Sequence, residues 1–155
     1  MTEAARPPIP RFNHVAMSLP AEALGEAGRA DLLRFYGDVF GWTEMPTMTV
    51  DGERLVLRCH SHEQFVFLHA AEEPMRCGNH EHWGMSVATP EELDAILGRA
   101  EKFRERDDRV EIDPRQLEDF KVLKLHSFYV RYLLPLTVEV QCFEWAEGMD
   151  DQSGT

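Results

Sequence analysis

The sequence has 155 residues, of which 43% are hydrophobic and 28% charged, and this composition is typical of one folded domain and excludes wholesale disorder. Its net charge of −12 at pH 7 repels phosphate backbones, so we expect no nucleic-acid partner. No apolar run is long enough to span a membrane, and the Pro-rich stretch Met1–Pro10 lacks the apolar segment of a secretory signal. We therefore expect a cytoplasmic protein without a membrane partner.

The first half of the sequence predicts one strand, one helix and three further strands. Residues Phe12–Leu19 alternate in polarity until Pro20 ends the strand. The apolar residues of Asp31–Phe40 recur at i, i+3 and i+4, as in an amphipathic helix, and Gly41 follows as a stop signal. The stretch before this helix, Pro20–Arg29, fits either a loop or a poor helical turn. Strand-like runs follow at Thr43–Val50, Arg54–Cys59 and Phe65–Ala70, with Asp51-Gly52 as a hairpin turn.

The second half predicts the same order of elements. Glu81–Val87 has the pattern of a strand, and three signals then agree on a helix start. Thr89 is suited to the N-cap, Pro90 to the first helical position, and Glu92 to the closing of a capping box. The apolar spacing continues this helix to Phe103. Further strands are expected near Arg109–Ile112, Val122–Tyr132 and Thr137–Phe143.

The two halves also resemble each other in sequence. The run His14-Val15-Ala16-Met17-Ser18-Leu19 matches His82-Trp83-Gly84-Met85-Ser86-Val87, which begins 68 residues later and has identical His, Met and Ser. We therefore predict an α+β fold in which one strand–helix–three-strand module occurs twice. The single domain spans residues 11–145, with module one at 11–72 and module two at 80–145, between loosely ordered tails at 1–10 and 146–155.

Three residues lie by pattern on the polar sides of strands: His14, His82 and Glu139. Bulky apolar residues occupy the other side of each strand and are natural contacts for the helices. Each residue alone has an ordinary interpretation, a hydrogen-bonded wall residue for the histidines and a solvated side chain for the glutamate. Together, two imidazoles and one carboxylate are suited to a divalent metal with open coordination positions. Fe(II) is favoured, and Mn(II), Zn(II) or Ni(II) are alternatives.

The sequence resembles the vicinal-oxygen-chelate superfamily, which includes glyoxalase I, bleomycin-resistance proteins and extradiol dioxygenases. The resemblance covers about Phe12 to Glu144 and rests on the His14 strand, the helix end Leu33–Trp42, the His82 strand with its following Pro90-Glu91-Glu92-Leu93, and Phe128-Tyr129-Val130-Arg131 before Val138-Glu139. It implies two βαβββ modules whose sheets curl around one cleft, with helices outside. His14, His82 and Glu139 then fall on three of the four family metal positions.

Two positions depart from the family pattern. The fourth metal position falls near Phe67, which cannot bind metal; His69 shares its face and is an alternative one residue pair away. The usual Asp-Pro-Asp-Gly turn is replaced by the apolar Tyr132-Leu133-Leu134-Pro135, which we expect at the cleft mouth, in contact with substrate or a partner.

The resemblance leaves three functions open. A set of two His and one Glu favours an extradiol-type dioxygenase acting on a vicinal diol or a similar small substrate, with His126 and Tyr132 as acid–base candidates, although their spacing departs from the dioxygenase fingerprint. A glyoxalase- or epimerase-type lyase or isomerase is the first alternative. The second is a metal-free binding protein of the bleomycin-resistance kind, since the net charge suits a cationic ligand. A homodimer is expected in each case.

Overall fold

The structure is a computed structural model that describes residues 9–149, so most of both predicted tails lies outside the described residues. The order of elements is strand, helix and three strands, twice, as the sequence predicts. The elements of module one are β1 (His14–Leu19), the 3-10 helix η1 (Ala21–Leu24), α1 (Glu26–Phe40), β2 (Thr43–Glu44), β3 (Arg54–Arg58) and β4 (Phe65–Ala70). Those of module two are β5 (His82–Val87), α2 (Pro90–Arg104), β6 (Glu111–Asp119), β7 (Leu123–Arg131) and β8 (Thr137–Trp145).

Each module forms one four-stranded sheet, and the two sheets have the same topology. Sheet one has the order β1-β4-β3-β2 and sheet two the order β5-β8-β7-β6. In both, the first strand is parallel to the last and all other neighbours are antiparallel. The registers also agree, because Ala16 lies opposite Phe67 as Gly84 lies opposite Glu139. The predicted duplication is therefore confirmed down to individual residue pairs.

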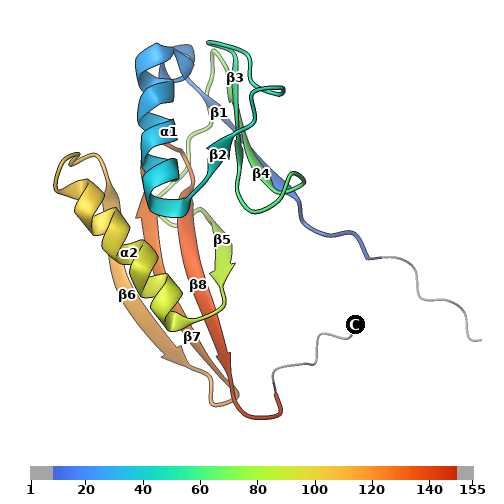
Figure 1. Ribbon diagram of the computed structural model, residues 1–155, viewed down its shortest axis with the longest axis vertical. Coiled ribbons are helices and arrows are strands. Elements are labelled where there is room, and N and C mark those ends of the chain that lie inside the picture. The colour runs from blue at the N-terminus through green and yellow to red at the C-terminus, as the bar shows by residue number, and fades with distance from the viewer. Residues whose placement is uncertain (1–8, 150–155) are drawn as a thin grey trace, which may run out of the picture.

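The two sheets remain separate within the described part of the chain. β1 and β5 are both edge strands, each hydrogen-bonded to a single neighbour. Figure 1 shows sheet one above sheet two, with α1 and α2 next to each other on the same side of the molecule. The predicted α+β fold with two modules is confirmed, but one chain does not close its sheets around a shared cleft.

The hydrophobic core lies between the helices and one face of each sheet. In module one, Met17, Leu55 and Leu68 are buried together with Phe35 and Tyr36 of α1. Burying a side chain of this size stabilises the fold by about 1.5–3 kcal/mol. Module two repeats the arrangement with Leu93, Ala100, Phe103, Phe128, Val130, Val138 and Val140. The opposite faces of the sheets are not covered by these helices, and we refer to the one that carries Glu139 as the open face of sheet two.

Tyr132 connects the two modules by packing against α1. Its ring stacks on Phe35 of α1 at a centroid distance of 4.4 Å, and its carbonyl accepts a 3.0 Å hydrogen bond from the hydroxyl of Tyr36. Leu134, two residues later, is only 4% exposed. The apolar turn that we expected at a cleft mouth is therefore largely used in the core, because its side chains fill the junction between the modules.

Three element boundaries differ from the prediction. α1 begins at Glu26, five residues before the predicted start, and η1 precedes it, so the second of the two alternatives for Pro20–Arg29, a helical turn, is the one found. β2 has two residues only. β6 extends through Pro114 to Asp119, with an irregular register between Asp113 and Gln116. Proline is tolerated there because β6 is an edge strand, where a missing N–H breaks the sheet least.

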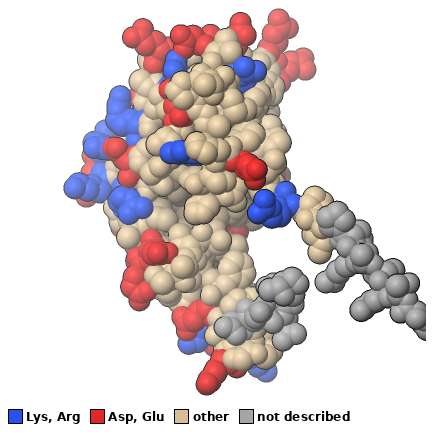
Figure 2. Space-filling view, turned by 45° about the vertical axis from the view of Figure 1, so that its right-hand side comes forward, with Lys and Arg blue, Asp and Glu red and all other residues tan. Residues whose placement is uncertain are grey.

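The N-terminus of α2 follows the prediction closely. The Thr89 hydroxyl accepts a 3.2 Å hydrogen bond from the backbone N–H of Glu92, with Pro90 in the first helical turn. The Glu92 carboxylate in turn accepts a hydrogen bond from the N–H of Ala88, one residue before the cap. No helix of residues 9–149 is long and apolar enough to cross a bilayer. On the side of the molecule turned forward in Figure 2, charged side chains gather towards the ends and one flank, around a largely uncharged surface.

Candidate functional site

His82 and Glu139 meet on the open face of sheet two. They lie on adjacent parallel strands, β5 and β8, and His82 Nε2 is 3.2 Å from Glu139 Oε2. The other ring nitrogen, Nδ1, is 2.7 Å from the carbonyl oxygen of His80, which can only accept a hydrogen bond. This contact assigns a proton to Nδ1 and directs the Nε2 position at the carboxylate. A second proton on the imidazole or a bound cation between Nε2 and Oε2 is then needed to make this short contact favourable.

The second oxygen of Glu139 is held by Tyr129. Tyr129 lies directly opposite Glu139 in the β7–β8 register, and its hydroxyl donates a 2.7 Å hydrogen bond to Oε1. The bond to a carboxylate, together with partial burial, raises the pKa of Tyr129 to about 12. Glu139 itself is only 6% exposed. Both of its oxygens therefore have defined partners in an otherwise costly buried position.

Module one keeps the histidine of this arrangement but not the other two groups. By register, Phe67 occupies the position of Glu139, and Val56, opposite Phe67, occupies that of Tyr129. His14 is exposed, its Nδ1 lies 2.7 Å from Oδ1 of Asn13, and its ring stacks on Phe65. Among residues 9–149, no three His, Cys, Asp or Glu side chains lie close enough together to hold a metal ion. Within one chain, His14 thus does not join His82 and Glu139.

His69, the alternative to Phe67 as the fourth metal position, does not lie beside His14. It is exposed, and its Nδ1 is 3.3 Å from the carbonyl oxygen of Ala70. In the register of sheet one it lies opposite Ser18, four residues beyond His14 along β1. The pairing of strands therefore separates the backbone positions of His14 and His69 by about 13 Å along the strand direction.

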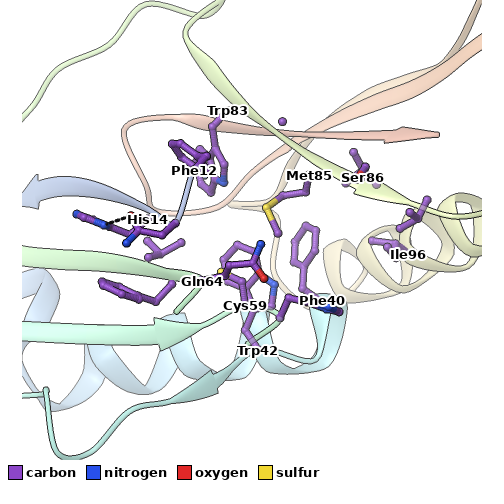
Figure 3. A pocket seen from close by; sticks show the side chains of 17 residues that line it. Phe12, His14, Phe40, Trp42, Cys59, Gln64, Trp83, Met85, Ser86 and Ile96 are labelled. Carbon is purple, nitrogen blue, oxygen red and sulfur yellow. Dashed lines mark hydrogen bonds between the residues drawn. The ribbon is translucent and has the colours of Figure 1, made fainter. Parts of the chain in front are cut away.

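His14 instead borders a cavity of about 440 Å³ between the two modules. Aromatic side chains dominate its wall, and Figure 3 shows Phe12 and Trp83 on one side and Trp42 on the other, with His14 at one end. Phe40 and Phe65 complete the aromatic lining. His82 and Glu139 do not line this cavity, so the predicted metal residues border two separate surfaces of the chain.

A smaller polar pocket of about 130 Å³ lies on the open face of sheet two and includes Tyr129 in its lining. Tyr129 lines it together with Arg131 and Thr137, and its rim carries Glu111 and Asp113. Arg131 is half-buried and is paired with Glu111 at 2.5 Å. Tyr129 thus lines the pocket and also donates to Glu139, so the pocket reaches the hydrogen-bonded pair through Tyr129 alone.

His126 and Tyr132, the predicted acid–base candidates, lie elsewhere. His126 is opposite Cys142 in the register, so its side chain points to the α2 side of sheet two and away from Glu139. There it lies between the guanidinium of Arg115, 2.9 Å from Nδ1, and the carboxylate of Glu144, 3.0 Å from Nε2. The Tyr132 hydroxyl donates a 2.6 Å hydrogen bond to Asp107 at the junction of the modules. Neither residue contacts the His82–Glu139 pair in the described part of the chain.

Tyr129 is the partner of Glu139 that the sequence analysis missed. Its run, Phe128-Tyr129-Val130-Arg131, carried part of the family resemblance, but the spacing to Glu139 alone did not show which of its residues faces the carboxylate. The register depends on the length of the turn between β7 and β8. Counting outward from the turn, five residues lie between Arg131 and Thr137, and this places Tyr129 opposite Glu139.

Comparison with known proteins finds likeness in structure only. No family model and no curated protein matches the sequence. A lactoylglutathione lyase from Agrobacterium tumefaciens matches with a TM-score of 0.57 at 17% identity, covering 87% of this chain and 95% of its own. A fosfomycin resistance protein from Listeria monocytogenes matches with a TM-score of 0.58 at 14% identity, and the match covers 86% of this chain and 91% of that protein. A glyoxalase/bleomycin resistance protein/dioxygenase from Alicyclobacillus acidocaldarius matches with a TM-score of 0.63 at 12% identity, and the match covers 89% of this chain and 94% of that protein. These matches confirm the expected fold.

Proposed function

We propose that this chain, which has the vicinal-oxygen-chelate fold, is a metal-dependent enzyme that acts on a small molecule with two neighbouring oxygen atoms. The observation that supports this most is the 3.2 Å approach of His82 Nε2 to Glu139 Oε2, with the proton of the imidazole assigned to the opposite nitrogen. A divalent cation bound to both Nε2 and Oε2 would make this short contact favourable, and it would gain one nitrogen and one oxygen ligand. The substrate's paired oxygens can occupy further positions on the same ion.

The groups around the pair fit such a metal. The carbonyl of His80 fixes the orientation of His82, and the hydroxyl of Tyr129 fixes that of Glu139, which is the usual role of groups behind metal ligands. Imidazole with carboxylate suits Fe(II), Mn(II), Zn(II) or Ni(II). When bound, the ion would polarise the substrate oxygens. Tyr129 keeps its proton at neutral pH, since its pKa is about 12, and can donate it to an oxygen of the substrate only when Glu139 changes partner.

His14 supplies the third protein ligand from a second copy of the chain. Two donors leave most positions of a divalent ion open, and the described residues of one chain offer no third His, Cys, Asp or Glu beside them. His14 is exposed on β1, an edge strand, and His82 begins β5, the other edge strand. A homodimer that sets sheet one of one copy against sheet two of the other brings one His14 to each His82–Glu139 pair.

Ring-opening oxygenation is the favoured reaction because the fourth position holds Phe67. An extradiol-type site uses two His and one Glu and keeps positions for a catechol and for O2, whereas isomerases of this fold type use a fourth protein ligand. The aromatic cavity beside His14 supports the alternative of a metal-free protein that binds a cationic aromatic molecule, since aromatic faces attract cations.

Metal binding tests the proposal first. Calorimetric titration with Fe(II) under anaerobic conditions, and with Zn(II), should give one equivalent per chain, lost in Glu139→Gln and His82→Ala and weakened in His14→Ala. His69→Ala is the matched control, because His69 is also an exposed histidine in a strand of sheet one. Binding of less than about a tenth of an equivalent by the unaltered chain contradicts the proposal and favours the metal-free alternative.

Mixing of variants tests the shared site. His14→Ala and Glu139→Gln chains each lack one ligand, but a mixed dimer carries one intact site and one site lacking both. Refolding them together should therefore recover tight binding at about a quarter of the sites present, if chains pair at random. If the mixture recovers no metal binding, His14 and Glu139 either belong to one site within a single chain or share no site. Oxygen uptake and the yellow product of ring opening with a panel of catechols then identify the reaction.

A further inference from the structure

The open face of sheet two has an apolar end as well as a polar one. Leu125 lies opposite Phe143, and Leu123 lies opposite Trp145, all four on the face that carries Tyr129 and Glu139. Phe143 and Trp145 are 41% and 44% exposed, and their rings stack with centroids 6.3 Å apart at 15°. We refer to these four residues as the aromatic ledge.

The ledge is continuous with the His82–Glu139 pair. Glu139, Gln141, Phe143 and Trp145 alternate along one side of β8, and β5 ends at Val87, opposite Cys142, so no neighbouring strand flanks the ledge on that edge. At 3.2–3.4 Å per residue, Phe143 is roughly 13 Å from Glu139 along the strand. Between them, the amide of Gln141 lies over Gly84, where a Cβ atom would be 3.3 Å from Oε1. Two uncharged residues that lie opposite each other, Gln141 and Ser127, thus join the polar end to the apolar end.

A small molecule suits this ledge better than a second protein. The exposed fractions of Phe143 and Trp145 leave roughly 200 Å² of ring surface between them, because a whole aromatic side chain contributes about 150–250 Å². A stable interface between two proteins buries roughly 800 Å² on each partner. An anionic membrane surface is disfavoured by the net charge of −12. Two stacked, exposed rings in line with a candidate site match the apolar part of a substrate.

We propose that the substrate is an amphiphile whose two-oxygen head binds at His82 and Glu139 and whose extended alkyl or aryl tail lies on the aromatic ledge. The head assignment rests on the proposed function, whereas the tail assignment rests on the ledge alone. Along β8, a tail of about eight carbon atoms extends from a head at Glu139 as far as Phe143, whose ring stacks on that of Trp145. An alkyl-substituted catechol is the simplest molecule of this kind.

A series of catechols with 4-alkyl chains tests the tail on the protein without metal. Affinity is measured by calorimetry for the unsubstituted, butyl and octyl compounds, below the concentrations at which they form micelles. We expect the octyl compound to bind at least about tenfold more tightly than the butyl compound, because each methylene that reaches the ledge leaves water. The variant Phe143→Ser/Trp145→Ser should abolish this gain. Val50→Ser is the matched control, since Val50 is 39% exposed on a hairpin of module one.

Fluorescence gives the location of the tail independently of affinity. Trp42 and Trp83 are 5% and 9% exposed, so Trp145 dominates the solvent-accessible emission. The octyl compound should shift this emission to shorter wavelength, and Trp145→Phe should remove the shift while it keeps the gain in affinity. The midpoint of thermal unfolding checks that each variant is folded, as expected for substitutions of exposed side chains.

The outcomes separate the ledge from the proposed function. Equal affinities for butyl and octyl compounds, or a gain that survives in the Phe143→Ser/Trp145→Ser variant, overturn the ledge proposal. A change of oligomeric state in that variant, measured by light scattering, also overturns it, because the ledge then belongs to a subunit interface. If Glu139→Gln binds metal and catechol as the unaltered chain does, yet the gain with tail length persists, the proposed metal site fails and the ledge stands.

Discussion

Tyr129 donates a 2.7 Å hydrogen bond to Glu139 from the directly opposed position on the neighbouring strand. The corresponding pair in module one is Val56 and Phe67, which cannot form such a bond. Two modules with the same fold and the same strand register therefore carry different side chains at equivalent positions, apolar in module one and hydrogen-bonding in module two. The module with the carboxylate also orients its histidine through the His80 carbonyl, whereas the histidine of the other module contacts Asn13 and stacks on Phe65.

The hydrogen bond between Tyr129 and Glu139 predicts an unusual tyrosine titration. The chain has three tyrosines, and each has its pKa raised: Tyr36 and Tyr132 mainly by burial, and Tyr129 to about 12 mainly by Glu139. The folded protein should therefore show no tyrosinate absorbance near pH 10. In Glu139→Gln the largest cause is gone, so one equivalent should titrate closer to pH 10.

The same bond predicts the sign of its effect on stability. Because the pKa of Tyr129 is higher in the folded chain than in the unfolded one, its contribution to stability is complete below about pH 10 and is lost as the pH rises toward 12. Circular dichroism along the titration shows where the chain is still folded. One equivalent of tyrosinate near pH 10 in the unaltered, folded chain would be inconsistent with the bond.

The register also predicts what a carboxylate in module one would do. Phe67 lies opposite Ala16 as Glu139 lies opposite Gly84, so Phe67→Glu adds an oxygen donor on the face of His14. If His14 of a second copy completes the metal site, this change should strengthen metal binding on the order of tenfold, since affinity rises with the number of charged ligands. Calorimetry measures the change. The control, Phe67→Gln, has a similar shape without the charge, and an equal effect of both variants would contradict the prediction.

The sequence predicts the modules well because their signals are local. The repeat beginning at His14 and His82, and the helix start at Thr89, depend on residues close together in the chain, and both are present in the structure. The separation of the two sheets could not be predicted, because it depends on how α1 meets the turn at Tyr132, a contact between residues 96 positions apart. The partner of Glu139 was missed for a related reason, since a strand register depends on the length of the intervening turn.

His126 is predicted to be a structural residue that takes no part in the His82–Glu139 site. Arg115 can only donate, so its contact at 2.9 Å makes Nδ1 an acceptor, and Nε2 then donates to Glu144. This bond and Lys124 hold the pKa of Glu144 below its usual value. In His126→Gln, the pKa of Glu144 should therefore rise toward its ordinary value, while metal binding at His82 and Glu139 stays unchanged. Carbon-13 shifts of the Glu144 carboxylate report its pKa in the two proteins, and loss of metal binding in this variant would restore His126 as a site candidate.

Asp107 and Tyr132 predict how acid weakens the contact between the modules. The Tyr132 hydroxyl donates to Asp107 and accepts a 2.9 Å hydrogen bond from Arg109, and the bonds from Arg109 and Tyr132 hold the pKa of Asp107 well below its usual range. A lowered pKa stabilises the folded state above the ordinary aspartate pKa of about 3.9, and this contribution is lost as the pH falls below it. Tyr132→Phe should lower the free energy of unfolding at pH 7 by about 1–3 kcal/mol, because it removes the hydrogen bonds of the hydroxyl to two charged groups, Asp107 and Arg109.

The pH dependence of that loss separates the hydrogen bonds from the packing of the ring. Asp107→Asn removes the charge and keeps the shape, so the difference in unfolding free energy between it and the unaltered chain should be largest above about pH 5 and shrink as the pH falls below about 4. Tyr132→Phe retains the stacking on Phe35, which does not depend on pH. Urea denaturation at a series of pH values measures both variants. A difference for Asp107→Asn that stays constant from pH 7 to the acid limit would show that Asp107 acts through its shape alone, because only a proton-linked contribution can vary with pH.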